Sequence, residues 1–234
     1  MVDPSRADPL TAGAHKGLIA WIASMLTPDA YVMVIGGGLM MESGIRRVIT
    51  TKDEDVVLLL VVSGSLQVAD VSRIAELVRA LGSEPTVRKD QTSVSCTLGT
   101  DDGRFFVEFV RGRRAGGGYF VSRAVLERVA ARSAREGRVL VPPLEALAFL
   151  KAWAAVDKAK LVRAGKDGQG YHAARERAFR DDVQAVLGRI LDVRQVDGAV
   201  VDELLEACGR DRAREVRRVL IEAGWPFESD GGGE

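Results

Sequence analysis

The amino-acid sequence predicts an α+β protein in which a sheet flanked by helices is followed by a helical bundle. Up to Val141, apolar runs of strand length alternate with segments of helical period. After Pro142 and Pro143, nearly every segment has the helical period. We therefore predict an α/β domain over residues 1–141, a helical domain over 142–226 and a flexible tail over 227–234.

The first predicted elements lead into a cluster of glycines. Apolar residues at helical spacing predict a helix over 14–26, and the β-branched run at 31–35 predicts a strand. That strand runs into Gly36–Gly38 and a short helical turn that Gly44 closes. The continuous apolar run at 55–63 predicts a second strand that is buried on both faces.

The remaining elements of the first domain follow from hydrophobic period and turn residues. An amphipathic helix is predicted over 68–82, and strand segments follow at 85–90, 92–100 and 103–112, the last two joined by a hairpin turn. A helix with Ser122 as its N-cap is predicted over 122–137. The helical domain is predicted to hold four helices, at 144–162, 171–191, 199–209 and 212–224.

Composition limits the classes of function. Lys plus Arg and Asp plus Glu each total 33, so no global basic field indicates nucleic-acid binding. The first ten residues lack the pattern of a signal peptide, and no apolar run has the length of a membrane span. Cys96 and Cys208 are far apart and read as reduced thiols. We expect a cytoplasmic protein.

The stretch from Gly36 to Asp55 carries the chemistry of a candidate site. Glycines after a strand, Gly36 and Gly37, let backbone amides approach a phosphate. Asp53 and Asp55 stand two apart at the start of a strand, so their side chains point to the same side. Two carboxylates beside a phosphate site are typical ligands of Mg²⁺. Glu54 is expected to point the other way.

Glu108 is the third candidate carboxylate. It lies in a strand of apolar residues, where an unpaired carboxylate is costly to bury. It would complete the metal site or deprotonate an attacking hydroxyl. Pairing with Arg104 or Arg111 at the sheet edge is an equally good interpretation.

The segments "GGGLMMESG" and "TKDEDVVLLL" resemble the signature of the DNA polymerase β-like nucleotidyltransferase superfamily. They are most similar to the minimal nucleotidyltransferases and the toxins of type IV-like toxin–antitoxin systems, and "PPLEALAFLKAWA" and "RAFRDDVQAVL" also resemble that group. The resemblance implies a mixed sheet and covers roughly residues 31–187.

The resemblance also implies roles for particular residues. Gly36 and Gly37 would hold the phosphates of a nucleoside triphosphate, while Asp53 and Asp55 would bind Mg²⁺ or Mn²⁺. Lys151 would contact the triphosphate, and Asp182 would act as a base or orienter. The acceptor would be RNA, a protein or a small molecule, and an antitoxin would be a possible partner.

Several alternatives stay open at the level of sequence. Ile49 and Glu54 depart from the family pattern, which favours a non-catalytic module that binds nucleotide or a partner. Lys151 also fits a surface lysine, and Asp182 fits a helix-surface ion pair. His15 and His172 have no companions at ligand spacing and are interpreted as ordinary residues.

Overall fold

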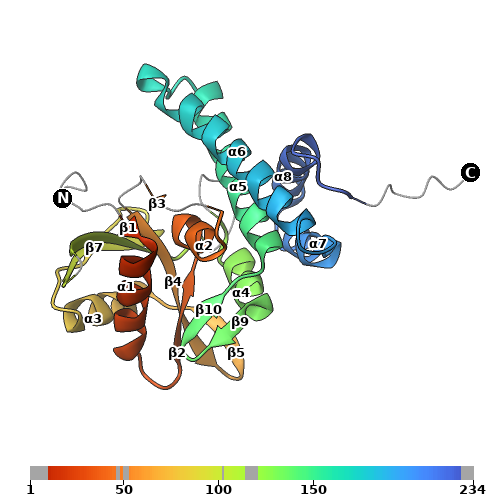
Figure 1. Ribbon diagram of the computed structural model, residues 1–234. Coiled ribbons are helices and arrows are strands. Elements are labelled where there is room, and N and C mark those ends of the chain that lie inside the picture. The colour runs from red at the N-terminus through yellow and green to blue at the C-terminus, as the bar shows by residue number, and fades with distance from the viewer. Residues whose placement is uncertain (1–9, 46–47, 50–52, 102, 114–120, 228–234) are drawn as a thin grey trace, which may run out of the picture. The chain divides into compact units, whose positions relative to one another are not determined.

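The computed structural model describes residues 10–45, 48–49, 53–101, 103–113 and 121–227 (Figure 1). The chain forms two compact units. One unit joins residues 1–115 to 122–143, and the other joins residues 116–121 to 144–234. The predicted α+β class is confirmed, because the first unit holds a mixed sheet flanked by helices and the second holds a bundle of helices.

The first unit is built on a sheet whose strands run in the order β6-β7-β8-β4-β2-β10-β9, with β5 paired to β4. β4 lies between an antiparallel neighbour, β2, and a parallel neighbour, β8, so the sheet is mixed. The strand bounds are β2 Ala30–Val34, β4 Asp53–Val62, β5 Ser65–Val68, β6 Thr86–Val87, β7 Ser93–Thr100, β8 Gly103–Val110, β9 Ala134–Glu136 and β10 Val139–Val141. A separate two-stranded pair joins β1 Leu10–Thr11 to β3 Val48–Ile49.

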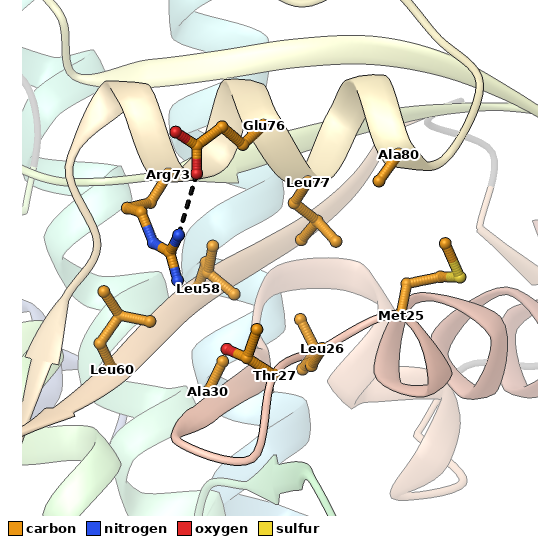
Figure 2. Close-up of a pocket in the computed structure, with 10 residues that line it drawn as sticks. All are labelled: Met25, Leu26, Thr27, Ala30, Leu58, Leu60, Arg73, Glu76, Leu77 and Ala80. Atoms are coloured by element: carbon orange, nitrogen blue, oxygen red, sulfur yellow. Dashed lines mark hydrogen bonds and ion pairs between the residues drawn. The ribbon is translucent and has the colours of Figure 1, made fainter.

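The helices of this unit are α1 Ala12–Ser24, α2 Gly36–Glu42, α3 Val71–Ala80 and α4 Arg123–Arg132. Their caps follow the sequence: Thr11, Asp70 and Ser122 each accept a backbone hydrogen bond from the first turn of α1, α3 and α4, respectively. The apolar face of α3 is buried, as its amphipathic pattern predicts. Between α3 and the end of α1 lies a pocket of about 190 Å³, with Leu58 and Leu77 in its wall (Figure 2).

The second unit consists of α5 Leu144–Arg163, α6 Tyr171–Leu191, α7 Gly198–Glu206 and α8 Arg210–Glu222, with a short 3₁₀ turn, η2 Gly168–Gly170, before α6. α5 packs on each of the other three helices. Apolar side chains of α6 such as Val183, Val186 and Ile190 are fully buried. Phe227 is the last described residue, so the rest of the predicted tail lies outside the described residues.

Two strands at one edge of the sheet correct the prediction of a helix over 122–137. The helix ends at Arg132, and residues Ala134–Glu136 form β9, which pairs with β10. Gly137 makes the turn between them with a positive φ of 63°, a conformation that favours glycine. All three residues of β9 are exposed. Their sequence, Ala-Arg-Glu, has no alternation of apolar and polar residues that would indicate a strand.

The described helices include none that is both long enough and apolar enough to cross a membrane. Cys96 and Cys208 are both free thiols, and burial raises the pKa of each to about 12.

Candidate active site

The register between β4 and β8 brings two of the predicted carboxylates together. The two strands are parallel, and Asp55 is the cross-strand partner of Glu108. Partners in neighbouring strands present their side chains to the same face of a sheet. The backbone of Asp53 pairs with Phe106, two positions earlier, but the side chain of Asp53 lies outside the described part of the chain.

Gly36 lies directly against Asp55. The amide of Ile35 donates a 3.0 Å hydrogen bond to the Asp55 carbonyl, which fixes the end of β2 beside the start of β4. A Cβ atom at position 36 would lie 2.6 Å from Asp55 Oδ2, closer than any side chain allows. Gly36 also has a positive φ of 65°. Conformation and close approach therefore both require glycine where the chain passes the carboxylate.

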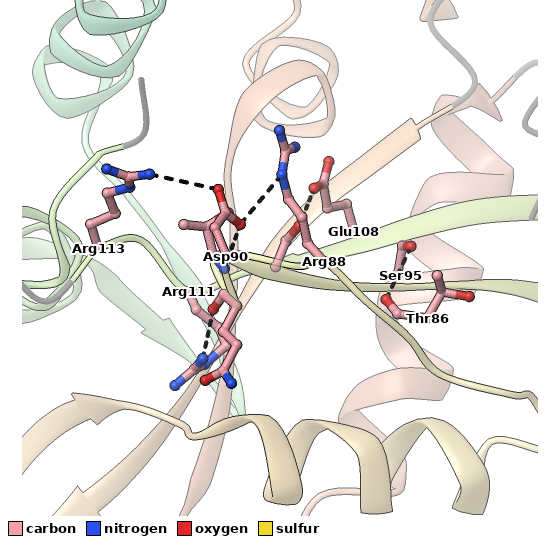
Figure 3. A network of polar contacts seen from close by, with 10 residues as sticks. Thr86, Arg88, Asp90, Ser95, Glu108, Arg111 and Arg113 are labelled. Carbon is pink, nitrogen blue, oxygen red and sulfur yellow. Dashed lines mark hydrogen bonds and ion pairs between the residues drawn. The ribbon is translucent and has the colours of Figure 1, made fainter. Parts of the chain in front are cut away.

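Glu108 is half-buried and accepts a hydrogen bond from the Ser93 hydroxyl of β7 (Figure 3). Of the two arginines that sequence offers as partners, Arg111 directs its guanidinium to backbone carbonyls. Its Nε donates to Ala69 O at 3.1 Å and its NH1 to Gln91 O at 2.6 Å. The Ser93 contact orients the Glu108 carboxyl group.

Glu54 points away from this site into a buried cluster that sequence reasoning missed. His15 Nδ1 lies 3.2 Å from Glu54 Oε2, and His15 Nε2 lies 3.0 Å from Glu42 Oε1. His15 and Glu54 are 0% and 1% exposed. The imidazole therefore links three elements: α1, which carries it, α2, which begins at Gly36, and β4, which carries Asp55. The sequence contained one signal for this cluster. Glu54 lies inside an apolar strand, and a buried glutamate needs a buried partner.

The two carboxylates set the protonation of His15. Burial alone would lower the pKa of His15, but its contacts with Glu42 and Glu54 outweigh burial and raise the pKa to about 9. Burial raises the pKa of Glu54, and His15 opposes that rise. We conclude that His15 carries its proton at neutral pH and that the cluster is held by charge as well as by packing.

Gly38 is a second point, besides Glu42, at which α2 meets this cluster. A Cβ atom there would lie 2.2 Å from Glu54 Oε1 and 2.6 Å from His15 Cε1. The last glycine of the cluster therefore serves packing, whereas Gly36 borders the carboxylate of Asp55.

Lys151 and Asp182 are brought together inside the second unit. Lys151 Nζ on α5 lies 2.8 Å from Asp182 Oδ2 on α6, and both residues are buried. Lys151 Nζ also lies 5.4 Å from the centre of the Phe179 ring. Lys151 is therefore not an exposed surface lysine, and Asp182 is paired with a lysine of another helix rather than only with neighbours on its own helix.

Carboxylate oxygens on one face of a sheet suit a hard cation such as Mg²⁺. Asp55 and Glu108 supply two such groups in the described structure, and Asp53 would supply the third. Among side chains that the structure describes, no cluster of three or more His, Cys, Asp or Glu residues is arranged to hold a metal ion. The donor chemistry fits Mg²⁺, and a complete site requires Asp53.

Comparison with known proteins gives little further information. No protein-family model matches the chain, and no curated protein matches its sequence. A solved structure with some likeness is an antigenic nucleotidyltransferase-like protein from Paracoccidioides brasiliensis. The match covers 84% of this chain and 94% of that chain, with 15% identity and a TM-score of 0.38. At this level of similarity we reason about function from the residues of this chain alone.

Proposed function

We propose that the protein is a metal-dependent nucleotidyltransferase, which moves a nucleoside monophosphate from a nucleoside triphosphate to an acceptor hydroxyl. The observation that carries the proposal is the pairing of Asp55 with Glu108 on neighbouring parallel strands, with Gly36 packed on Asp55. This order of glycines, strand and carboxylates is also the one on which the resemblance to the DNA polymerase β-like superfamily rests.

Each residue has a role that its chemistry supports. Asp53, Asp55 and Glu108 would hold Mg²⁺ or Mn²⁺, and the bound cation would neutralise charge on the phosphates. Backbone amides at Gly36 and Gly37 would contact the phosphates, because a glycine backbone permits close approach. Glu108 would accept the proton of the acceptor hydroxyl as it attacks the α-phosphorus, and pyrophosphate would leave.

Lys151 and Asp182 belong to the proposal through the resemblance. Lys151 would neutralise phosphate charge, and Asp182 would orient the lysine amine or act as a base. The ion pair of 2.8 Å between them most directly supports the role of Asp182 in orienting the lysine, because the pair fixes the lysine side chain in one position. The choice among RNA, protein and small-molecule acceptors, and an action as the toxin of a toxin–antitoxin pair, also stay proposals.

Transfer of label tests the proposal. The protein is incubated with α-labelled nucleoside triphosphates, Mg²⁺, and total RNA or a cell extract, and labelled products are separated by size. We expect labelled product from the wild type, and a loss on the order of a hundredfold or more for Asp55→Asn and Glu108→Gln, as expected when charge stabilisation of several kcal/mol is removed. Asp101→Asn, in an exposed turn of the same unit, is the matched control and should retain activity.

The labelling experiment, together with calorimetry of nucleotide binding, decides the alternative function. A chain that binds a nucleoside triphosphate in calorimetry, yet labels nothing with any acceptor fraction, is a non-catalytic nucleotide-binding relative. Glu54 does not itself favour that alternative, because its side chain lies in the buried cluster with His15 and leaves the face of Asp55 unaltered. Equal labelling by wild type and Asp55→Asn would contradict the catalytic proposal.

A further inference from the structure

The first unit has a second pocket, besides the one between α3 and α1, and Gly36 does not line it. It is a cavity of about 680 Å³, a size typical of small-molecule sites. Four chain segments meet there: the start of α3, the turn before β7, the chain that follows β8 and the start of α4. Its lining consists of Asp70, Val71, Ser72, Asp90, Gln91, Arg111, Gly112, Arg113 and Arg123.

Arginines outnumber aspartates in this lining by three to two. Arg111 is only 4% exposed, and the carbonyls of Ala69 and Gln91 hold its guanidinium in place. Gln91 adopts a positive φ of 55°, unusual for a residue other than glycine. The buried arginine is thus already fixed in the wall of the cavity before any ligand binds.

Both aspartates of the lining are occupied with local structure. Asp70 caps α3, since its Oδ1 accepts a 2.9 Å hydrogen bond from Arg73 N. Asp90 Oδ1 accepts hydrogen bonds from the amide and hydroxyl of Thr92, at 3.2 and 2.6 Å. Its contacts with arginines are longer, at 3.4 Å to Arg88 Nε and 3.8 Å to Arg113 NH2 (Figure 3).

We propose that this cavity binds a phosphorylated small molecule of nucleotide size, with the arginines holding its phosphate. Guanidinium groups bind phosphate oxygens through two parallel hydrogen bonds, and a phosphate dianion suits the excess of positive charge. The volume leaves room for an organic group of about the size of a nucleoside beside the phosphate.

The cavity also borders the candidate active site. Thr92 O accepts the amide hydrogen of Arg111, and the next residue, Ser93, donates its hydroxyl to Glu108. A ligand in the cavity would therefore contact the turn that leads into Ser93, the residue that orients Glu108. The proposed phosphate site in the cavity does not depend on the proposed transferase function, because neither Asp55 nor Glu108 lines the cavity.

Calorimetric titration of the full chain with adenosine monophosphate tests this site. Divalent metal is omitted, so that metal-dependent binding near Asp55 does not contribute. We expect saturable binding that weakens as salt is raised, and no binding of adenosine, which lacks the phosphate. Arg113→Glu should weaken binding at least tenfold, whereas Arg113→Lys, which keeps the charge but loses the planar fork, should weaken it less.

Controls locate the binding. Arg128→Glu, on an exposed position of α4 outside the cavity, should bind within twofold of wild type. Amide resonances of Val71, Ser72, Gln91 and Gly112 should shift on titration with the monophosphate. Unchanged binding by Arg113→Glu, absence of saturable binding by wild type, or shifts confined to Gly36 and Gly37 would each overturn the proposal. Thermal melting of each variant verifies that it is folded.

Discussion

Gly36 lies so close to Asp55 that a methyl group at position 36 would overlap the carboxylate, with its carbon 2.6 Å from Oδ2. The glycine turn and the carboxylate thus constrain one another. No side chain fits between the turn and the Asp55 carboxylate. This contact ties the two parts of the candidate site together, whichever ligand binds there.

Gly36→Ala should therefore destabilise the protein and displace Asp55. Gly82→Ala is the matched control, because Gly82 has a similar positive φ of 74° but nothing lies within 4 Å of a Cβ atom added there. We expect Gly82→Ala to cost on the order of 1–2 kcal/mol for the left-handed conformation alone. Gly36→Ala should cost about 1–3 kcal/mol more, for the overlap. Urea denaturation measures both, and equal losses would contradict the close contact.

Gly38→Ala and Gly13→Ala should change stability in opposite directions. Both glycines lie in helices without a positive φ, but a Cβ atom at Gly38 would meet Glu54 and His15, whereas nothing lies within 4 Å of one at Gly13. Gly13→Ala should stabilise the protein by about 0.5–1 kcal/mol through the higher helix propensity of alanine. Gly38→Ala should destabilise it by about 1–3 kcal/mol through overpacking. Chemical denaturation checks both, and a stabilising Gly38→Ala would disprove the buried cluster.

The buried His15 should make stability depend on alkaline pH. Its pKa is raised from 6.5 to about 9 on folding, so the folded state holds the proton more tightly than the unfolded state does. This contribution is fully present below pH 6.5 and is lost as pH rises through 9, with a slope of at most about 1.4 kcal/mol per pH unit. Unfolding free energies measured between pH 6 and 10 should show this decline.

Replacement of each histidine separates this effect from general alkaline unfolding. His15→Gln should flatten the decline, because glutamine does not titrate. His172→Gln, at the other histidine of the chain, should leave the decline unchanged. If His15→Gln and wild type lose stability in parallel over this range, His15 does not carry a raised pKa.

The ion pair between Lys151 and Asp182 should contribute to the stability of the folded protein. Their side chains are 9% and 5% exposed, so removing one partner leaves the other charge buried. Lys151→Ala and Asp182→Ala should each cost on the order of 3–5 kcal/mol. Lys160→Ala breaks a half-exposed pair with Glu215 in the same unit, and it should cost at most about 1 kcal/mol. A double-mutant cycle on Lys151 and Asp182 measures their coupling, and additive losses would disprove the pair.

Local patterns determined most of the secondary structure. The caps at Asp70 and Ser122, the amphipathic period of α3 and the apolar run of β4 are each written in neighbouring residues, and the structure contains them all. The short edge strand β9 has no such local signature. Its three residues are all exposed, and only pairing with a neighbour makes them a strand.

For the candidate site, too, some features follow from local sequence and others only from the tertiary structure. The sequence by itself determined the residue types, the glycines and the alternation that separates Glu54 from Asp55. Only the tertiary structure decided which residues meet: Asp55 with Glu108 through the parallel register, Glu54 with His15 from a distant helix, and Lys151 with Asp182 across two helices. The physical reason is that side-chain direction follows from local backbone geometry, whereas partners across long loops are selected by packing of the whole chain.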